Sequence, residues 1–258
     1  MKKYCSDLVV NSVERISNRF VLIKLTQGTP LPPIMPGQFV EVRVDGSPRA
    51  FLRRPISVHY VDRELNELWL LVAVVGEGTQ WMSHLRFGDV LNVVYPLGNG
   101  FSLSVAPGQR CLLVGGGVGI APLLELGKEL SALGADVTFL LGGKNASDVS
   151  YVDIYKKYGR VLLTTEDGSV GEQGFVTQHS VLSQERFDSI SVCGPKPMMV
   201  AVARYAKEHG IPCEVSLENL MACGLGACLC CVEKTVEGNL CVCKEGPVFN
   251  INRLLWLS

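Results

Sequence analysis

The sequence lacks an excess of charge of either sign, a long apolar run and a large number of histidines. Its 24 Lys and Arg residues balance 25 Asp and Glu residues and are dispersed along the chain, so no basic stripe is present to bind nucleic acid. The longest uncharged apolar segment, residues 111–124, is interrupted by glycines and is too short to span a membrane. The four dispersed histidines form no His-rich metal site. These absences favour a small molecule or another protein as the partner.

A secretory signal is also missing. The first residues carry charge, but no apolar segment follows them. The ten cysteines therefore fit free thiols in a reducing cytosol better than a disulfide framework. We expect a soluble, cytoplasmic protein, and 258 residues allow one large domain or two modest domains with an appendage.

The sequence does contain a cysteine-rich loop near its C-terminus. Cys223, Cys228 and Cys231 are spaced C-x4-C-x2-C, which is the plant-type ligand spacing of a [2Fe–2S] cluster. The glycines and the alanine between the first two cysteines suit a loop whose backbone N–H groups approach the sulfur atoms. A fourth thiolate is available at Cys241 or Cys243, and the spacing alone does not separate these two.

A zinc site is the alternative for this loop. Cys228, Cys231, Cys241 and Cys243 could form a four-thiolate knuckle, and cysteine clusters of cytosolic proteins are often zinc sites. That arrangement leaves Cys223 and the glycine-rich loop without a purpose. The spacing therefore favours the iron–sulfur cluster.

The N-terminal part of the chain is a succession of short runs rich in β-branched and aromatic residues. Gly, Pro and Asp separate these runs, and no long helical period appears. Strands are expected at residues 20–25, 39–44, 56–60, 68–75 and 90–94. Regularly spaced strands of this kind indicate a small antiparallel barrel.

Two stretches of this barrel suit a cofactor that carries phosphate groups. Residues 53–57, Arg-Arg-Pro-Ile-Ser, place a cation and a hydroxyl along one edge, although an arginine pair alone is usually solvated surface. In residues 75–83 a strand ends in glycines, and Thr79 can cap a helix running through Leu85. A pyrophosphate could then rest on Gly78 and Thr79, although this stretch alone also fits an ordinary strand, turn and helix. Two such stretches on one barrel favour the cofactor site.

From Arg110 the pattern changes to alternating strands and helices, which is typical of a doubly wound parallel sheet. A buried strand at 111–114 leads into a phosphate-binding turn at 115–122, although the third glycine of the usual dinucleotide fingerprint is absent. Further strands are expected at 137–141, 161–164 and 190–192, and helices at about 153–158, 176–182 and 198–209.

The ligand of such a sheet should lie at the C-terminal ends of its strands. Cys193 and Gly194 follow the last of these strands. Cys193 is therefore the candidate catalytic residue. The other interpretation is a small buried residue, which is the usual place of a free cysteine.

The order of these parts predicts an electron-transfer protein. Nicotinamide gives up two electrons as hydride, whereas a [2Fe–2S] cluster takes one at a time, and a flavin is the usual converter between them. A barrel with two phosphate-binding stretches, a nucleotide-binding domain and an iron–sulfur tail therefore predict NAD(P)H, flavin and cluster in series. The sequence shows no second substrate-binding apparatus, such as a Ser/His/Asp set, so the electrons should pass to a partner protein.

These motifs together resemble a known family. The barrel and the α/β part are similar to the ferredoxin–NAD(P)+ reductase family at Arg54-Pro55-Ile56-Ser57, Gly78-Thr79, the turn 115–122 and Cys193-Gly194-Pro195. The whole chain resembles the electron-transfer subunits of class 1B dihydroorotate dehydrogenases, through the segments 165–169 (TEDGS), 218–224 (ENLMACG) and 243–249 (CKEGPVF). Two departures are Glu166, where the family often has Asp, and the additional thiols Cys230 and Cys241.

The resemblance implies a β barrel plus α/β architecture in three domains. These are an FAD-binding antiparallel barrel at 1–103, an NAD-binding doubly wound domain at 104–212 and a small [2Fe–2S] domain at 213–258. FAD would be held by Arg54, Pro55, Ile56, Ser57, Leu71, Val72, Ala73, Gly78 and Thr79. The nucleotide site would include Gly115, Gly116, Gly117, Gly119, Gly194 and Pro195. The cluster ligands would be Cys223, Cys228, Cys231 and Cys243, because the match Cys-x2-Gly-Pro-Val-Phe selects Cys243 over Cys241.

The resemblance also implies a function. Such a subunit pairs with an FMN-containing catalytic subunit, two copies of each, and passes electrons from dihydroorotate through its cluster and FAD to NAD+ in pyrimidine (UMP) biosynthesis. The alternative is a reductase subunit of an electron-bifurcating ferredoxin–NAD(P)+ oxidoreductase, or of a sulfide or hydrogenase complex. A third hypothesis is a zinc-bearing, nucleotide-responsive binding protein without turnover. Lys144-Asn145 offers no arginine for a 2′-phosphate, which favours NAD over NADP.

Overall fold

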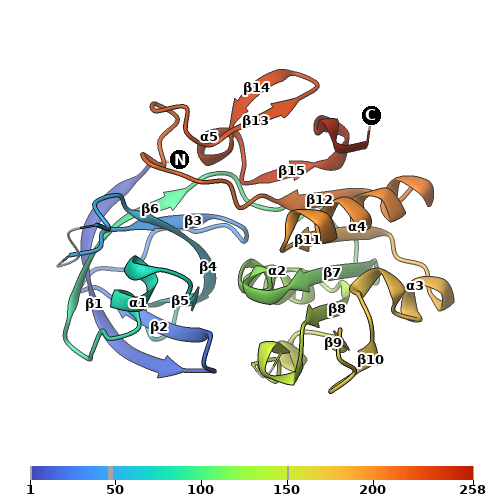
Figure 1. Cartoon of the computed structure of the whole chain (residues 1–258), viewed down its shortest axis with the longest axis horizontal. Coiled ribbons are helices and arrows are strands. Elements are labelled where there is room, and N and C mark those ends of the chain that lie inside the picture. The colour runs from blue at the N-terminus through green and yellow to red at the C-terminus, as the bar shows by residue number, and fades with distance from the viewer. Residues whose placement is uncertain (1, 46–48, 150, 258) are drawn as a thin grey trace.

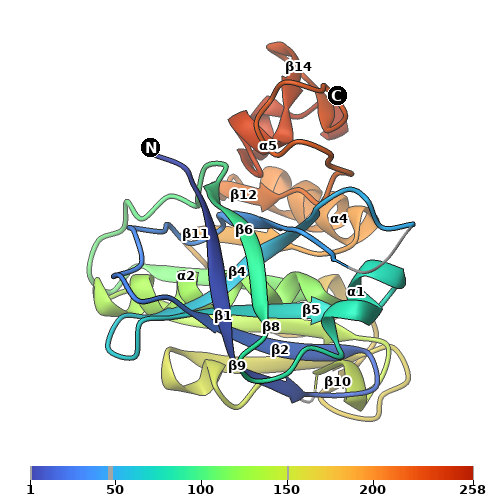
Figure 2. The ribbon, with the colours of Figure 1, turned by 90° about the vertical axis from the view of Figure 1, so that its left-hand side faces the viewer.

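The computed structural model describes residues 2–45, 49–149 and 151–257, and the remaining six positions, 1, 46–48, 150 and 258, lie outside it. It contains a closed antiparallel barrel, a seven-stranded sheet and a two-stranded ribbon. Figure 1 shows the barrel on the left, the sheet on the right and the C-terminal segment across the top of both. In Figure 2, turned by 90°, this segment stands above the rest of the molecule.

The barrel is built from the six N-terminal strands in the order β1-β2-β5-β4-β3-β6. Alternate side chains of each strand fill its apolar interior, as at Val40, Leu70 and Val93. On the outer face, Phe39 and Leu97 instead join a core beneath the C-terminal segment. The strands are β1 (Tyr4–Arg15), β2 (Phe20–Thr26), β3 (Phe39–Val42), β4 (Arg54–Asp62), β5 (Glu67–Ala73) and β6 (Val90–Leu97).

The helix expected after β5 is present but differs from the prediction. It is α1 (Glu77–Met82), it begins two residues before Thr79, and it ends before Leu85. The Thr79 hydroxyl accepts hydrogen bonds from the backbone N–H groups of Val75 and Gly76 at 3.0 and 3.1 Å. Thr79 therefore holds the start of the helix from its third position, because its side chain reaches back to the preceding turn.

The second sheet has the order β10-β9-β8-β7-β11-β12-β15, and all neighbours except β12 and β15 run parallel. Its strands are β7 (Arg110–Gly116), β8 (Asp136–Gly143), β9 (Arg160–Thr165), β10 (Glu172–Gln173), β11 (Ser189–Cys193), β12 (Cys213–Ser216) and β15 (Val248–Asn250). Its helices are η1 (Gly117–Ile120), α2 (Ala121–Ala132), η2 (Ala146–Val149), η3 (Tyr155–Lys157), η4 (Val176–Gln178), α3 (Val181–Gln184) and α4 (Lys196–Glu208).

Two hydrophobic cores cover the two faces of this sheet. Leu113 on one face packs with α2, and Leu112 on the other packs with α4. The sheet is therefore doubly wound, and the strand order reverses beside β7, where a ligand site is expected between β7 and β11. Two expected helices are shorter than predicted. Residues 153–158 contain only the single turn η3, and 176–182 are divided into η4 and α3 because His179 is extended between them.

The C-terminal segment has little core of its own and leans on both larger parts. Cys231, Val242 and Cys243 share one hydrophobic core with Phe39 of the barrel and Val215 of the sheet. Its first and last strands, β12 and β15, complete the seven-stranded sheet. Between them lie the ribbon β13 (Val232–Thr235) and β14 (Gly238–Cys241) and the turn α5 (Val242–Glu245), and η5 (Ile251–Arg253) and η6 (Leu255–Leu257) follow β15. The exact three-part division at residues 103 and 212 stays a prediction.

None of the helices in the described part of the chain is long and apolar enough to cross a membrane.

The contact between barrel and sheet contains a histidine that should make stability depend on pH. His59 is 0% exposed, and its Nδ1 lies 2.9 Å from the carbonyl oxygen of Ala121. Burial lowers the pKa of His59 from 6.5 to about 4, against the opposing effect of that hydrogen bond. The neutral ring therefore contributes stability fully above pH 6.5, and this contribution falls as the pH drops toward 4.

We expect the wild type to lose about 1.4 kcal/mol of unfolding free energy between pH 7.5 and 5.5 that a His59→Asn variant does not lose. Asparagine can still donate to the Ala121 carbonyl but does not titrate. Urea unfolding of both proteins across this pH range measures the difference. Parallel pH profiles for the two proteins would contradict this prediction, because they would show that folding does not lower the pKa of His59.

Candidate functional site

The cysteine loop of residues 223–231 brings backbone N–H groups to its sulfur atoms. The amide of Leu225 lies 3.3 Å from the Cys223 sulfur, and the amide of Gly226 lies 3.1 Å from the Cys243 sulfur. Gly224 and Gly226 have φ of 65° and 82°, a conformation that glycine adopts without strain. Such N–H···S hydrogen bonds stabilise thiolates that bind an iron–sulfur cluster.

The four predicted ligands are arranged as two pairs of thiols. Cys223 hydrogen-bonds to Cys228, and Cys231 hydrogen-bonds to Cys243. Two pairs of thiols match the two irons of a [2Fe–2S] cluster, which takes four thiolates in all.

The two candidates for the fourth ligand differ in their surroundings. Cys243 is 1% exposed, and its sulfur accepts the Gly226 amide. Cys241 also contacts Cys231, but its sulfur lies 3.9 Å from the Gly226 carbonyl oxygen and so faces an acceptor. A thiolate is stabilised by hydrogen-bond donors and destabilised by a neighbouring hydrogen-bond acceptor. The geometry thus supports Cys243, which stays a prediction together with the other ligands.

The electrostatics of the loop favour a thiolate at Cys223. Burial raises the pKa of Cys223, but the backbone N–H groups of Leu225, Cys228 and Ala227 outweigh it and bring the pKa down to about 6. This thiol can therefore bind metal at neutral pH with little cost of deprotonation.

A buried carboxyl group lies between the cluster loop and the barrel. Glu41 of β3 is 0% exposed, and neither of its carboxyl oxygens has a hydrogen-bond partner among the described residues. A Cβ at Gly224 would lie 2.7 Å from the Glu41 Cγ, so the loop rests directly on this side chain. Burial raises the pKa of Glu41 to about 7, while Arg53 lowers it. An unpartnered buried carboxyl is costly, which fits a site that a bound cofactor completes.

The residues predicted to bind FAD lie on the two sides of a split in the barrel. The pairing of β4 with β5 ends at Val58 and Leu70. Beyond it, Arg54–Ser57 pair with β3 on their other edge, and Leu71–Ala73 pair with β2 on theirs. Two strand edges thus diverge with backbone groups directed at the space between them. A planar flavin can take hydrogen bonds from such edges.

The two phosphate-binding stretches of the barrel meet at this split. A Cβ at Gly78 would lie 2.8 Å from the Arg54 Nε, so the guanidinium group passes directly over the glycine. Leu71 and Val72 are 2% and 1% exposed, because Val72 fills the barrel and Leu71 packs against the sheet. These two residues can contact FAD only through their backbone, whereas Arg54 presents its side chain.

The glycine-rich turn after β7 packs against the end of β11. A Cβ at Gly119 would lie 2.4 Å from the Cys193 carbonyl oxygen, and one at Gly116 would lie 2.5 Å from the Met198 sulfur. Gly117 has φ of 57° and open space around it. These glycines let the turn and the Cys193-Gly194 segment approach each other closely, as expected for the nucleotide site.

The predicted catalytic residue Cys193 is completely buried. Its sulfur lies 3.8 Å from the Glu218 carboxyl oxygen, and Gly115 and Ser216 flank it on the neighbouring strands. Burial raises the pKa of this thiol well above its usual value, and Glu218 adds to the shift. Cys193 is thus a neutral thiol at the switch point of the sheet, and its catalytic role stays a prediction.

A cavity of about 400 Å³ opens at the C-terminal ends of β7, β8 and β9. Three of the six predicted nucleotide residues, Gly116, Gly117 and Pro195, line it, and Lys144 and Glu166 lie beside them. The other three, Gly115, Gly119 and Gly194, are not part of its lining. The cavity is completed by side chains that the sequence analysis did not single out: Arg19, Asp148, Thr164, Phe175 and Met198. Arg19 comes from the barrel, and no sequence spacing relates it to the sheet.

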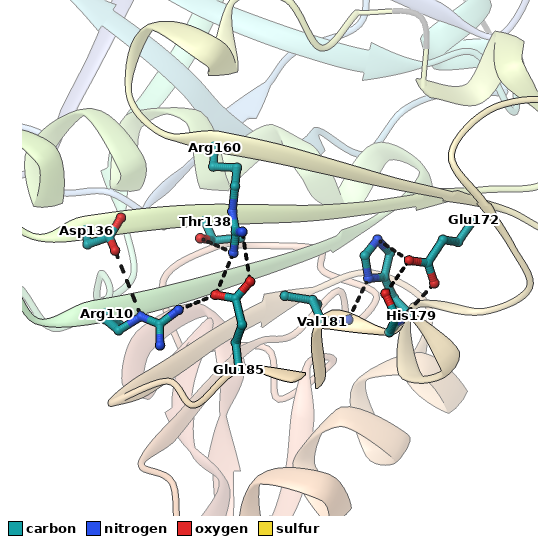
Figure 3. A network of polar contacts seen from close by, with 9 residues as sticks. Arg110, Asp136, Thr138, Arg160, Glu172, His179, Val181 and Glu185 are labelled. Atoms are coloured by element: carbon teal, nitrogen blue, oxygen red, sulfur yellow. Dashed lines mark hydrogen bonds and ion pairs between the residues drawn. The ribbon is translucent and has the colours of Figure 1, made fainter. Parts of the chain in front are cut away.

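A polar network lies at the N-terminal ends of β7, β8 and β9, opposite the ends at which the cavity opens (Figure 3). Arg110, Asp136 and Arg160 stand at the starts of β7, β8 and β9, and Glu185 pairs with both arginines. The hydrogen bond from Arg160 lowers the pKa of Glu185. These charges neutralise one another within the network, which links the starts of the three strands through Glu185.

Two family models match the chain. The "Oxidoreductase NAD-binding domain" matches residues 113–204, and the "Iron-sulfur cluster binding domain of dihydroorotate dehydrogenase B" matches residues 218–255. With the barrel in front of them, these domains define an NAD-binding flavin reductase that carries its own iron–sulfur domain. The expected architecture and the expected cofactors, FAD, a [2Fe–2S] cluster and NAD, are confirmed.

The similar proteins with an assigned function belong to one particular kind of flavin reductase. The chain is 38% identical to the dihydroorotate dehydrogenase B (NAD(+)) electron transfer subunit of Bacillus velezensis, over 96% of this chain and 97% of the relative. The same subunit of Fusobacterium nucleatum is 41% identical, over 83% of this chain and 84% of the relative. The chain belongs to the family of dihydroorotate dehydrogenase B electron transfer subunits.

Solved structures of flavin-dependent reductases share the fold. A chain of the NADH-dependent reduced ferredoxin-NADP oxidoreductase, an enzyme of flavin-based electron bifurcation, superposes with a TM-score of 0.86 at 30% identity. The match covers 96% of this chain and 90% of that one. The cytochrome P450 reductase of Amycolatopsis superposes with a TM-score of 0.68 at 26% identity, over 81% of this chain and 67% of that one.

Proposed function

We propose that this chain passes electrons between an FMN-containing dihydroorotate dehydrogenase subunit and NAD+, as part of pyrimidine biosynthesis. Oxidation of dihydroorotate to orotate releases two electrons and two protons, and NAD+ takes up the two electrons and one proton as hydride. FAD and the [2Fe–2S] cluster, when bound, supply the exchange between hydride and single electrons. The observation that carries the proposal is the succession of cluster loop, barrel split and nucleotide cavity within one chain.

The chain's own residues have separate tasks in this transfer. The cysteine loop holds the cluster, and Gly224 seats the loop on Glu41 of the barrel. Arg54 lies over Gly78 to hold phosphate groups of FAD. The turn from Gly115 to Gly119 brings the dinucleotide to the switch point, beside the strand that ends at the buried Cys193.

The partner subunit would dock around the cluster loop. Three leucines there point into solvent although they are apolar: Leu220 is 84%, Leu229 65% and Leu225 48% exposed. An exposed apolar group beside a redox site is typical of a protein interface. The proposal includes an assembly of two catalytic and two electron-transfer subunits. It places them in the cytoplasm, where thiols stay reduced, and all ten cysteines are free thiols in the structure.

A second candidate function is the reductase subunit of an electron-bifurcating ferredoxin–NAD(P)+ oxidoreductase. The superposition on the chain of such an enzyme over 96% of this chain favours it. The relatives at 38–42% identity favour dihydroorotate dehydrogenase instead, and their sequences are closer than the 30% of the bifurcating chain.

Co-purification separates the two candidates. The tagged chain is expected to bring down an FMN-containing barrel subunit, and the complex should reduce NAD+ when dihydroorotate is added. Recovery of a large FAD and iron–sulfur subunit, with no NAD+ reduction by dihydroorotate, would contradict the proposal and favour the bifurcating complex.

The choice between NAD and NADP gives a further prediction. Glu166 lines the nucleotide cavity at the end of β9, where a carboxylate would repel a 2′-phosphate. We expect wild-type protein to prefer NADH, and Glu166→Gln to raise its relative use of NADPH about tenfold, which corresponds to about 1.4 kcal/mol. Rates of flavin reduction by both nucleotides measure the ratio.

Asp167→Asn is the matched control for this variant. Asp167 neighbours Glu166, but its carboxylate accepts hydrogen bonds from the backbone and hydroxyl of Ser169 instead of lining the cavity. Its substitution should leave the nucleotide ratio unchanged. A wild-type preference for NADPH would overturn the expectation.

A further inference from the structure

Arg19 lies between the part of the barrel assigned to FAD and the cavity assigned to NAD. It precedes β2, and its backbone carbonyl accepts the N–H of Val74 at 2.8 Å, next to the end of β5 at Ala73. Its side chain reaches the other way, across the domain boundary, and lines the nucleotide cavity. One residue of the barrel is therefore part of the wall of a site that otherwise belongs to the α/β sheet.

An ion pair fixes the direction of this side chain. The Arg19 Nη1 lies 2.8 Å from the Asp148 Oδ1, and Asp148 is 3% exposed whereas Arg19 is 53% exposed. The second Asp148 oxygen accepts the backbone N–H of Lys144 at 3.0 Å. Asp148 thus binds the barrel arginine with one oxygen and the cavity loop after β8 with the other. The half-exposed guanidinium remains accessible from the cavity.

A dinucleotide bound in this cavity needs a cation near its pyrophosphate. A dinucleotide carries a pyrophosphate with two negative charges, and backbone N–H groups at Gly116 and Gly117 offer only partial positive charge. Asp148 and Glu166 add negative charge to the lining, and Lys144 adds one cation. The guanidinium of Arg19 has five N–H donors in a planar fork that suits phosphate oxygens, and the ion pair with Asp148 uses only Nη1.

We propose that Arg19 binds the pyrophosphate of NAD(H) from the barrel side, with Asp148 as its positioning residue. This inference rests on the proposed function, because it takes the cavity at β7, β8 and β9 as the NAD site. The nucleotide site is then complete only when barrel and sheet are joined through this ion pair. Phosphate recognition is then shared between the two domains, and Arg19 takes no part in binding the adenosine.

The test compares ligands that contain the pyrophosphate with one that does not. For the cofactor-loaded protein with Arg19→Ala, the dissociation constants of NADH and ADP-ribose should rise about 10- to 100-fold, as expected for loss of a charged hydrogen bond. The dissociation constant of adenosine should stay at the wild-type value. Arg19→Lys keeps the charge and should recover part of the loss, and Asp148→Asn should show the same pattern with a smaller rise.

Two further variants make each outcome decisive. Arg86→Ala removes an exposed arginine that is not part of the cavity lining, and NADH binding should not change. Ala201→Trp fills the cavity from α4 and should weaken NADH and adenosine alike. If Ala201→Trp weakens binding but Arg19→Ala does not, the inference is overturned and the NAD site stands. If neither variant affects NADH, the site itself is wrong. Equal weakening of adenosine and ADP-ribose by Arg19→Ala would also overturn the inference.

Discussion

Replacement of Cys228 by serine should remove the iron–sulfur absorption from the purified protein. Cys228 hydrogen-bonds to Cys223 in one of the two thiol pairs, and a serine oxygen is a poor substitute for a thiolate at iron. We expect iron and acid-labile sulfide to fall below about a tenth of the wild-type content, with the flavin retained. Metal analysis and the visible spectrum measure the loss.

The neighbouring cysteines provide the controls for this experiment. Cys230 is exposed and lies one residue out of register with the ligand spacing, so Cys230→Ser should keep the full cluster. Cys243→Ser should lose it, whereas Cys241→Ser should keep it, because only the Cys243 sulfur accepts the Gly226 amide. A cluster that survives in Cys243→Ser but not in Cys241→Ser would mean that the fourth ligand is Cys241.

The second large effect concerns retention of FAD. Arg54→Ala removes the guanidinium group that lies over Gly78, and a charged hydrogen bond to phosphate is lost. We expect FAD affinity to fall about 10- to 100-fold, so that the protein loses most of its flavin on dialysis. Gly78→Val should act in the same direction although it keeps the arginine, because a Cβ there displaces the Arg54 Nε.

Arg43→Ala is the matched control for the FAD experiment. Arg43 is also a barrel arginine, but it pairs with Asp45 on the surface, and both side chains are about half exposed. Its removal should leave the flavin content unchanged. Full retention of FAD by both Arg54→Ala and Gly78→Val would contradict the assignment of this site.

Local sequence patterns determine much of this fold. The parallel sheet could be predicted because strands such as Cys111–Val114 are short apolar runs followed by glycine turns, and β7 contains that run. The cluster loop could be predicted because iron ligation imposes a fixed spacing on consecutive residues. In both cases the interacting groups are close in the sequence, so the local sequence pattern is enough to predict the structure.

Tertiary relations account for the parts that the sequence did not reveal. Arg19 and Asp148 are 129 residues apart and meet only because β2 and the loop after β8 face one domain boundary. Glu41 has no distinctive sequence context, yet the fold buries it against Gly224. The split between β4 and β5 follows from where their pairing stops. Strand propensity predicts that a strand exists but not which edge it leaves unpaired.

Short helices were the least predictable elements. The alternation of strands and helices predicted a polar helix at 153–158, but Tyr155 is buried in the core and its hydroxyl donates a hydrogen bond to the Ile120 carbonyl at 2.9 Å. This contact holds a single turn in place. Tertiary packing of one large side chain therefore overrides the local helical preference.

The central claim is that electrons pass between NADH, FAD and the cluster within this one chain. Anaerobic addition of NADH to the purified, cofactor-loaded protein, followed by visible and electron paramagnetic resonance spectroscopy, tests it directly. We expect NADH to bleach both the flavin bands and the iron–sulfur shoulders, and a reduced [2Fe–2S] signal to appear. A colourless protein that contains zinc, or a cluster that stays oxidised while the flavin is reduced, would contradict the account.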